Sequence, residues 1–292
     1  MTWPARLALD YRHDGRCTRV ARRHSGPLQV MKALYPEGPA LCHTLIVHPP
    51  GGIAGGDDLA LDVNVGPGAQ ALVTTPGATK WYRANATAVG VDRALATAAP
   101  ARPDGGAAQT VIQRIEGALE WLPQEAIVFD RARATSRIDI DLAPGASTIG
   151  WDVVVFGRGA SGESFRDGAF TQSIRLVDDG QLEWVERTRL AGSDALLDSP
   201  IGLAGARAIG CLWAAGPAWR DDVLDDIRHA LAAATPDAQA APVTRVAPRL
   251  LLARVLAAGA PAARAALAAV WQVLRPRVFN GRAAVAPRIW AT

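Results

Sequence analysis

Several acidic residues stand where the surrounding sequence is apolar or rich in glycine. Glu120, Glu125 and Asp152 interrupt apolar segments, and Asp57 and Glu163 follow glycine-rich turns. A carboxylate stranded in an apolar core is costly, so each must be ion-paired, hydrogen-bonded, hydrated or bound to a metal. Each one alone is more often an ion-paired residue, and the abundant arginines provide partners. Glu120, Glu125, Asp152 and Glu163 together suggest a polar path through the interior.

Cys42 and His48 lie at the two ends of one short apolar segment. Strand alternation would place these two side chains on one face and His43 on the other, so only the first pair could share a metal ion. The alternatives are a packed cysteine and a capping histidine. The 5 histidines form no zinc-enzyme spacing, and the 3 distant cysteines indicate neither a disulfide framework nor a structural zinc site. A reducing compartment fits this cysteine usage.

The segment Gly157–Gly162 matches the dinucleotide-binding pattern G-x-G-x-x-G and has Asp178 and Asp179 about twenty residues further on. A dinucleotide-dependent oxidoreductase is therefore one interpretation. That fingerprint needs a helix to begin at its last glycine, whereas residues 163–177 contain Gly168 and β-type residues. The pattern thus favours a turn between two strands. No Ser/His or Cys/His arrangement typical of nucleophilic catalysis stands out, so we expect no enzyme.

The composition is typical of a folded protein with a sizeable core. The chain has 292 residues, of which 49% are hydrophobic, and its 31 basic and 28 acidic residues leave a net charge of only +3. So small an excess argues against nucleic acid as a partner. Charged residues interrupt the first 17 positions, so we expect no signal peptide. The longest apolar run, 208–219, is shorter than the ~20 residues of a membrane helix. We expect a soluble cytoplasmic protein that binds no membrane.

Short apolar runs bounded by Gly, Pro, Asp and Asn predict β-strands from about residue 7 to residue 186, as in 138–142 and 151–156. Some runs begin with a Gly-Ala pair, at Gly68-Ala69, Gly117-Ala118 and Gly145-Ala146. The spacing is unequal, so this is weaker than a true repeat. It nevertheless suggests β units stacked on one another.

Two helices are expected near the C-terminal end. The first begins near Asp221 and presents Val223, Ile227 and Leu231 at helical spacing. The second runs from Pro261 to Leu274, because proline is tolerated in a first turn and Pro276 should end the helix. The segment 249–256 fits either a strand or a helix, and 94–108 and 235–242 are expected loops. We predict one domain over residues 1–292, mostly β, as a stacked or helical arrangement of short strands with two α-helices.

Short motifs occur in order along almost the whole chain: Gly26-Pro27-Leu28, Tyr35-Pro36-Glu37-Gly38, Cys42-His43, His48-Pro49-Pro50-Gly51-Gly52, Gly55-Gly56-Asp57, Thr75-Pro76-Gly77-Ala78-Thr79-Lys80-Trp81-Tyr82-Arg83, Glu120-Trp121-Leu122-Pro123-Gln124-Glu125, Gly157-Arg158 with Gly162-Glu163, Trp271-Gln272, Leu274-Arg275-Pro276 and Pro287-Arg288-Ile289-Trp290. This ordered set resembles the urease accessory protein UreD family, also called UreH. The family pattern near Gly157 does not require the middle glycine, which weakens the dinucleotide interpretation. The resemblance is lost over 84–108, 192–210 and 235–246.

The resemblance implies a scaffold or metallochaperone component with no catalytic activity and no tightly bound cofactor. Proteins of this family bind UreF, which recruits the GTPase UreG, and the complex docks on apo-urease so that nickel is inserted. A hydrated internal route for nickel is also implied. Oxygen ligands release nickel more readily than nitrogen or sulfur ligands do. We therefore expect transient nickel stations at Asp57, Glu125, Asp152 and Glu163, with Cys42 and His48 as less favoured ligands.

The C-terminal motif offers candidates for a partner-binding surface. Exposed Trp and Arg side chains are frequent interface anchors, which favours Arg288 and Trp290 in that role. A C-terminal Trp folded back onto the core is an equally common arrangement. A structural interaction protein that never contacts nickel is a further alternative.

Overall fold

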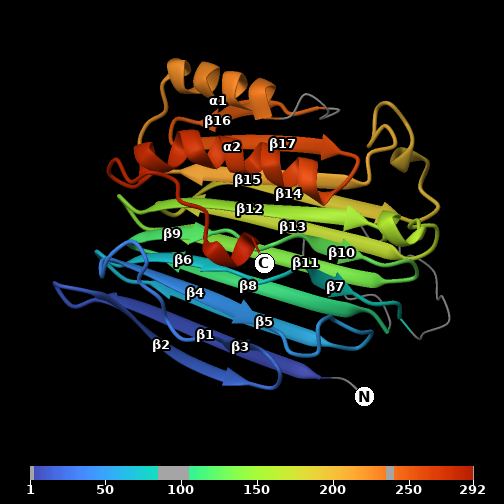
Figure 1. Cartoon of the computed structure of the whole chain (residues 1–292), viewed down its shortest axis with the longest axis horizontal. Helices are drawn as coiled ribbons and strands as arrows, with labels where there is room; N and C mark the ends of the chain where they lie inside the picture. The colour runs from blue at the N-terminus through green and yellow to red at the C-terminus, as the bar shows by residue number, and fades with distance from the viewer. Residues whose placement is uncertain (1–2, 85–104, 235–239, 292) are drawn as a thin grey trace.

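The computed structural model describes residues 3–84, 105–234 and 240–291, which form two β-sheets and a layer of helices (Figure 1). The 7-stranded sheet has the order β14-β13-β11-β8-β5-β1-β2. Its strands are β1 Pro4–His13, β2 Thr18–Ser25, β5 Asp58–Val65, β8 Ala107–Ile115, β11 Arg133–Leu142, β13 Ala169–Asp178 and β14 Gln181–Ala191. The 10-stranded sheet has the order β16-β17-β15-β12-β9-β6-β4-β3, with β10 beside β12 and β7 beside β10. Its strands are β3 Gln29–Val30, β4 Leu41–Val47, β6 Gln70–Thr74, β7 Thr79–Trp81, β9 Ala118–Trp121, β10 Ala126–Val128, β12 Ser147–Phe156, β15 Ala208–Ala215, β16 Val243–Ala247 and β17 Leu250–Ala257.

The chain alternates between the two sheets as it winds from β4 to β13. Strands β5, β8 and β11 are parallel neighbours in one sheet, and β6, β9 and β12 are parallel neighbours in the other. Gln70, Ala118 and Ser147 lie side by side in these strands, each within or directly after one of the Gly-Ala pairs. The predicted mostly β architecture is confirmed, and the Gly-Ala pairs mark its successive windings.

Two apolar cores follow from strand alternation. Inward positions of both sheets, such as Leu7, Val63, Val73 and Trp213, form the core between the sheets. The opposite face of the 10-stranded sheet forms a second core with the helices. Helix α1, Asp221–Ala234, has acidic residues in its first turn, which favour the helix N-terminus, and it buries one apolar stripe: Val223, Ile227 and Leu231.

Helix α2 spans Ala260–Val278 and so continues past Pro276, where the sequence predicted its end. Proline removes one amide donor and crowds the carbonyl four residues earlier, but in the last turn few helical bonds remain to be lost. The amide of Phe279 still donates to the carbonyl of Arg275 at 2.9 Å. Pro261 occupies the first turn, as predicted. The extension matters because it places Arg275 inside the helix.

The remaining expectations have clear outcomes in the described residues. The ambiguous segment 249–256 lies, apart from its first residue, in strand β17. The Gly157–Gly162 segment is a turn containing a short 3-10 helix, η1 Gly159–Ser161, and no helix begins at Gly162; the chain continues to β13. Two further short 3-10 helices are η2 Ala195–Leu197 and η3 Arg288–Ala291. Most of the expected loops 94–108 and 235–242 lie outside the described residues.

Candidate functional site

A row of polar side chains crosses the inner face of the 7-stranded sheet. Along β13, Gln172 occupies an inward-facing position in a series that is otherwise apolar. Its neighbours in register are Ser136 on β11 and Thr188 on β14, and Ser136 in turn pairs with Gln109 on β8. The strand register therefore brings four polar residues from distant parts of the sequence into one line.

Asp152 faces this row from β12 in the opposite sheet. Val154 belongs to the core between the sheets and Trp151 to the core beneath the helices, so alternation turns Asp152 toward the polar row. The Nε2 atom of Gln172 donates a hydrogen bond to Oδ2 of Asp152 at 2.6 Å. Burial raises the pKa of Asp152 above that of an ordinary aspartate, and the hydrogen bond from Gln172 opposes the rise.

Two cavities between the sheets meet at this hydrogen bond. The first has a volume of about 340 Å³ and the second a volume of about 270 Å³, and Asp152 and Gln172 line both. Gln109 and Ser136 continue the polar lining into the first cavity, and Thr188 continues it into the second. The polar row thus runs from one cavity into the other.

Each cavity also reaches exposed parts of the chain. The first is lined by Pro49, Gly51 and Gly77, which are exposed, and the second by Leu196 and Ile201. Ile201 is 91% exposed, so the second cavity ends beside a large apolar side chain at the surface. The two cavities share Asp152 and Gln172 in the interior, and each reaches the surface at its own segments.

One imidazole and one thiol in these linings could bind a metal ion. Burial lowers the pKa of His48 in the first cavity, with nearby Asp57 opposing, so the ring is neutral at pH 7. Burial raises the pKa of Cys211 in the second cavity well above that of an ordinary thiol; Glu186 adds to the rise and Arg254 opposes it. A protonated thiol is a poor metal ligand.

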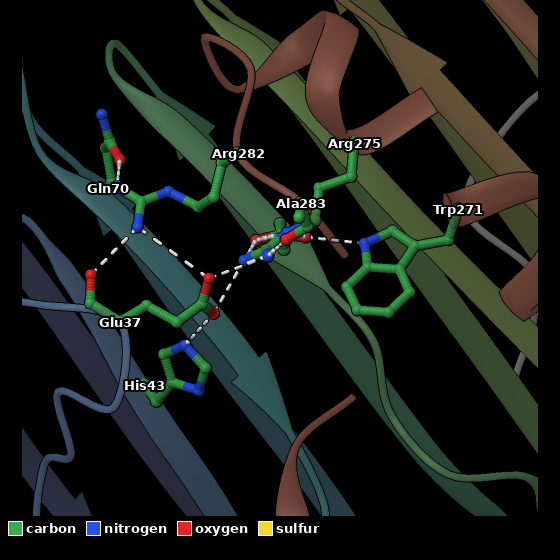
Figure 2. Close-up of polar contacts among 8 residues, drawn as sticks. Glu37, His43, Gln70, Trp271, Arg275, Arg282 and Ala283 are labelled. Carbon is green, nitrogen blue, oxygen red and sulfur yellow. Dashed lines mark hydrogen bonds and ion pairs between the residues drawn. The ribbon is translucent and has the colours of Figure 1, made fainter. Parts of the chain in front are cut away.

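A separate buried ion network holds α2 against the 10-stranded sheet (Figure 2). Arg275 and Glu120 are both 0% exposed, and Nε of Arg275 donates to Oε1 of Glu120 at 2.9 Å. Glu120 also accepts from the indole N–H of Trp271 at 2.7 Å. The same guanidinium donates to Glu37 at 2.8 Å, and Nε2 of His43 lies 2.9 Å from Glu37. The network joins the loop before β4, strand β9 and helix α2.

The segment after α2 is tied to the same network. Nη1 of Arg282 donates to the carbonyl of Glu37 at 3.1 Å, and Nη2 of Arg282 donates to Gln70 at 3.4 Å. The carbonyl of Ala283 accepts from Arg275. Because Arg275 contacts both carboxylates and this segment, it connects the C-terminal segment to the sheet (Figure 2).

Residues 4–291 match the family model described as UreD urease accessory protein. The chain belongs to the UreD family. It is 46% identical to the urease accessory protein UreD of Pseudomonas aeruginosa, over 99% of this chain and 95% of that protein. It is 42% identical to the protein of the same name from Nitrosococcus oceani, over 100% of this chain and 91% of that protein. It is 39% identical to the urease accessory protein UreD of Ralstonia nicotianae, over 100% of this chain and 95% of that protein.

In this UreD-family chain, the residues expected to form a nickel route lie in different parts of the structure. Asp152 and His48 line the cavities. Asp57 lies at the glycine-rich turn, where Oδ1 accepts from the amide of Trp3 at 3.3 Å and Oδ2 accepts from the amide of Ala54 at 2.9 Å. Asp57 therefore helps to shape the turn near His48.

The remaining expected stations lie away from both cavities. Glu125 is 3.4 Å from Arg264 in a groove beside α2, and Glu163 pairs with Arg158 at the Gly157 turn. The Arg158 guanidinium lowers the pKa of Glu163, with burial opposing. Cys42 is buried in the core between the sheets. Among these residues the structure brings only Asp152 and His48 to the interior path.

The polar row that faces Asp152 is not predicted by the local sequence. Its members are Gln109, Ser136, Gln172 and Thr188. Each is an uncharged residue within a strand, so none draws attention by itself. Phasing each strand and asking which inward position is polar would have found Gln172 and Ser136, but the alignment of the four needs the strand register.

The two C-terminal candidates for partner binding are placed differently. Arg288 is exposed, whereas Trp290 is half-buried. The indole N–H of Trp290 donates to Oγ1 of Thr74 at 2.9 Å, and its ring lies 5.4 Å from that of Trp151 and 5.8 Å from that of Trp271. Much of the Trp290 ring is therefore used within the chain, where it fixes η3 over the sheet.

Two further properties concern metals and membranes. Over residues 3–84, 105–234 and 240–291, no three His, Cys, Asp or Glu side chains are grouped so as to hold a metal ion. Neither α1 nor α2, nor any other helix in the described part of the chain, has the length and apolar character needed to cross a bilayer.

The buried network predicts that this protein loses stability as the pH falls from 7.5 to 5. Burial lowers the pKa of His43, with Glu37 opposing, so the unfolded chain, with a histidine pKa of about 6.5, takes up the proton first. The free energy of unfolding must then fall with pH through that range. Thermal unfolding at several pH values should show a smaller acid loss in His43→Gln. The exposed His229→Gln serves as the control, and equal pH slopes in all three proteins would contradict the prediction.

Proposed function

We propose that this chain is a non-catalytic scaffold that helps to deliver nickel to the urease apoprotein in the cytoplasm. In this proposal it acts in a complex with UreF, which recruits the GTPase UreG, and nickel contacts the chain only in transit. The complex needs neither nucleic acid nor a membrane. Membership of a family of urease accessory proteins supports the accessory role.

The observation that carries the proposal is the junction of the two cavities at Asp152 and Gln172. The carboxylate of Asp152 has a hydrogen bond from an amide but no ion pair with Lys or Arg among the described residues. Such a buried carboxylate is a favourable place for a passing divalent cation, because each compensates the desolvation of the other. The amide and hydroxyl oxygens of the polar row can replace part of the hydration shell of the cation.

The ligand types favour passage over retention. Nickel binds nitrogen and sulfur ligands tightly, so a lining rich in thiolates would hold the ion. The thiol of Cys211 is kept protonated by burial, and Glu186 accepts from Nε of Arg254 at 2.9 Å. Asp152 is left as the carboxylate that is available to a cation in the path. His48 offers one neutral imidazole in the first cavity.

The test is activation of purified urease apoprotein by nickel, bicarbonate, GTP, UreF and UreG, with and without this protein. We expect urease activity to appear substantially faster and to a higher level when the protein is present. Nickel content of the urease, measured after the complex is removed, should rise in parallel. If neither activity nor nickel content depends on the protein, the proposed function is wrong.

A further inference from the structure

The end of the molecule formed by β2 and β3 carries a larger positive net charge than the chain as a whole. Strand β2 ends the 7-stranded sheet and β3 ends the 10-stranded sheet, and both lie at the lower edge of the molecule in Figure 1. Residues 12–32 contain one acidic residue, Asp14, and six exposed cationic side chains, which we name the basic end: Arg12, Arg16, Arg19, Arg22, Arg23 and Lys32. Because the chain's net charge is +3, the rest of the molecule is slightly acidic.

The basic end is only partly neutralised within the chain, because two of its six cationic side chains pair with Asp10 or Asp14 and the others have no such partner among the described residues. Arg12 on β1 lies directly opposite Arg19 on β2, and like charges opposite each other destabilise a sheet. Asp14 pairs with Arg19 at 2.7 Å. Arg12, Arg16 and Lys32 have no carboxylate partner in the described parts of the chain. An acidic surface from outside would remove this repulsion, so the arrangement is complementary to an anionic partner.

Apolar side chains beside the basic end favour a protein as that partner. Met31 is 50% exposed and Leu34 is 47% exposed, next to the partly exposed ring of Tyr35. Arg22 donates to the carbonyl of Met31 at 3.1 Å, which joins the cationic and apolar parts into one surface. Charges on edge strands often serve only to prevent aggregation, but exposed Met and Leu side chains would work against that purpose. A protein interface uses both kinds of side chain.

We propose that the basic end, with Met31 and Leu34, docks on an acidic surface of the urease apoprotein. This inference rests on the proposed function, because urease is the protein that the chain would serve. The surface differs from the cavity linings and from the C-terminal residues Arg288 and Trp290. Electrostatic attraction would speed the encounter, and the apolar side chains would slow dissociation.

The experiment measures binding of the full chain to purified urease apoprotein at several salt concentrations. In the variant Arg16→Glu, Arg19→Glu and Arg23→Glu, we expect binding weaker by about tenfold or more and a flatter salt dependence. The matched control, Arg187→Glu, Arg220→Glu and Arg228→Glu, makes the same change in net charge at exposed positions on β14 and near α1. It should bind within about twofold of the unmodified chain. The circular dichroism spectra of both variants should match that of the unmodified chain, which checks that they fold.

A second variant tests the apolar part of the same surface. Leu34→Ser should raise the dissociation rate several-fold without changing the salt dependence. Equal binding by the charge-reversed variant and the control would overturn the inference, as would displacement of urease by random-sequence duplex DNA at physiological salt. If the unmodified chain promotes activation while both triple variants do so equally, the proposed function stands and the docking surface does not.

Discussion

Replacing Arg275 with methionine should lower the free energy of unfolding by about 3–5 kcal/mol at pH 7, because it leaves the buried carboxylate of Glu120 without its cation and removes the nearer of the two guanidinium groups that pair with Glu37. Glu120 is 0% exposed, and Glu37 is bound to the same guanidinium. The loss is a large part of the ~5–15 kcal/mol that typically stabilises a folded protein. Urea denaturation followed by tryptophan fluorescence measures it. Since the network also fixes the segment after α2, proteolysis near Arg282 should become faster.

The pH dependence distinguishes an unpaired charge from simple loss of packing. Burial raises the pKa of Glu120, and removal of Arg275 takes away the largest opposing effect. A carboxyl whose folded-state pKa exceeds its unfolded value of about 4.3 costs stability as the pH rises above that value. The defect of Arg275→Met should therefore be smaller at pH 5 than at pH 7.5, opposite in direction to the expected acid loss of the unmodified protein.

Two controls separate the buried pair from ordinary ion pairs. Arg264→Met removes the partly exposed partner of Glu125 and should cost much less stability. Combining Arg275→Met with Glu120→Leu should cost less than Arg275→Met alone, because the stranded carboxylate is then absent. A loss below about 1 kcal/mol for Arg275→Met would mean that the network contributes little to the fold.

Local sequence patterns predicted most of the fold but not the extent of α2. The apolar stripe of α1 and the runs at 138–142 and 151–156 each carry their own periodicity, and the structure has a helix or strand at each. The Gly-Ala pairs indicated stacking because each precedes or begins one winding. Pro276 predicted too early an end for α2. The tertiary contacts of Arg275 stabilise the last turn of the helix although Pro276 lacks an amide donor.

The candidate site was predictable only where one residue breaks a local pattern. Asp152 is acidic in the middle of an apolar strand, and that signal led to the cavity junction. Glu125 and Glu163 gave similar signals, but Arg264 and Arg158 pair with them outside the cavities. Local sequence does not tell which carboxylate meets an arginine. The arginine comes from a distant helix in the case of Glu125 and from the other side of a turn in the case of Glu163, so the ion pair forms only when the chain folds.

Asp152→Ala should slow nickel-dependent activation of urease by about tenfold or more, the largest functional effect that we expect of a single substitution. The change removes the carboxylate that both cavities share and leaves the rest of the polar row in place. Asp152→Asn keeps nearly the same volume, and its side-chain oxygen can still accept from Gln172. A comparable loss in Asp152→Asn would therefore assign the effect to the charge, since the cavity shape and the hydrogen bond are retained.

The same activation assay distinguishes a nickel route through this chain from a purely scaffolding role, because the control carboxylates lie outside the two cavities. Glu125→Ala and Glu163→Ala remove the same charge at positions outside the two cavities, and each should activate urease within about twofold of the unmodified chain. The Asp152 variants should bind UreF as well as the unmodified chain does, since Asp152 faces the space between the sheets. If Asp152→Asn and Asp152→Ala support full activation, nickel does not depend on this junction, and the chain serves urease as a scaffold alone. If only the Asp152 variants lose urease activation while their binding to UreF is unchanged, the result supports passage of the cation between the two sheets.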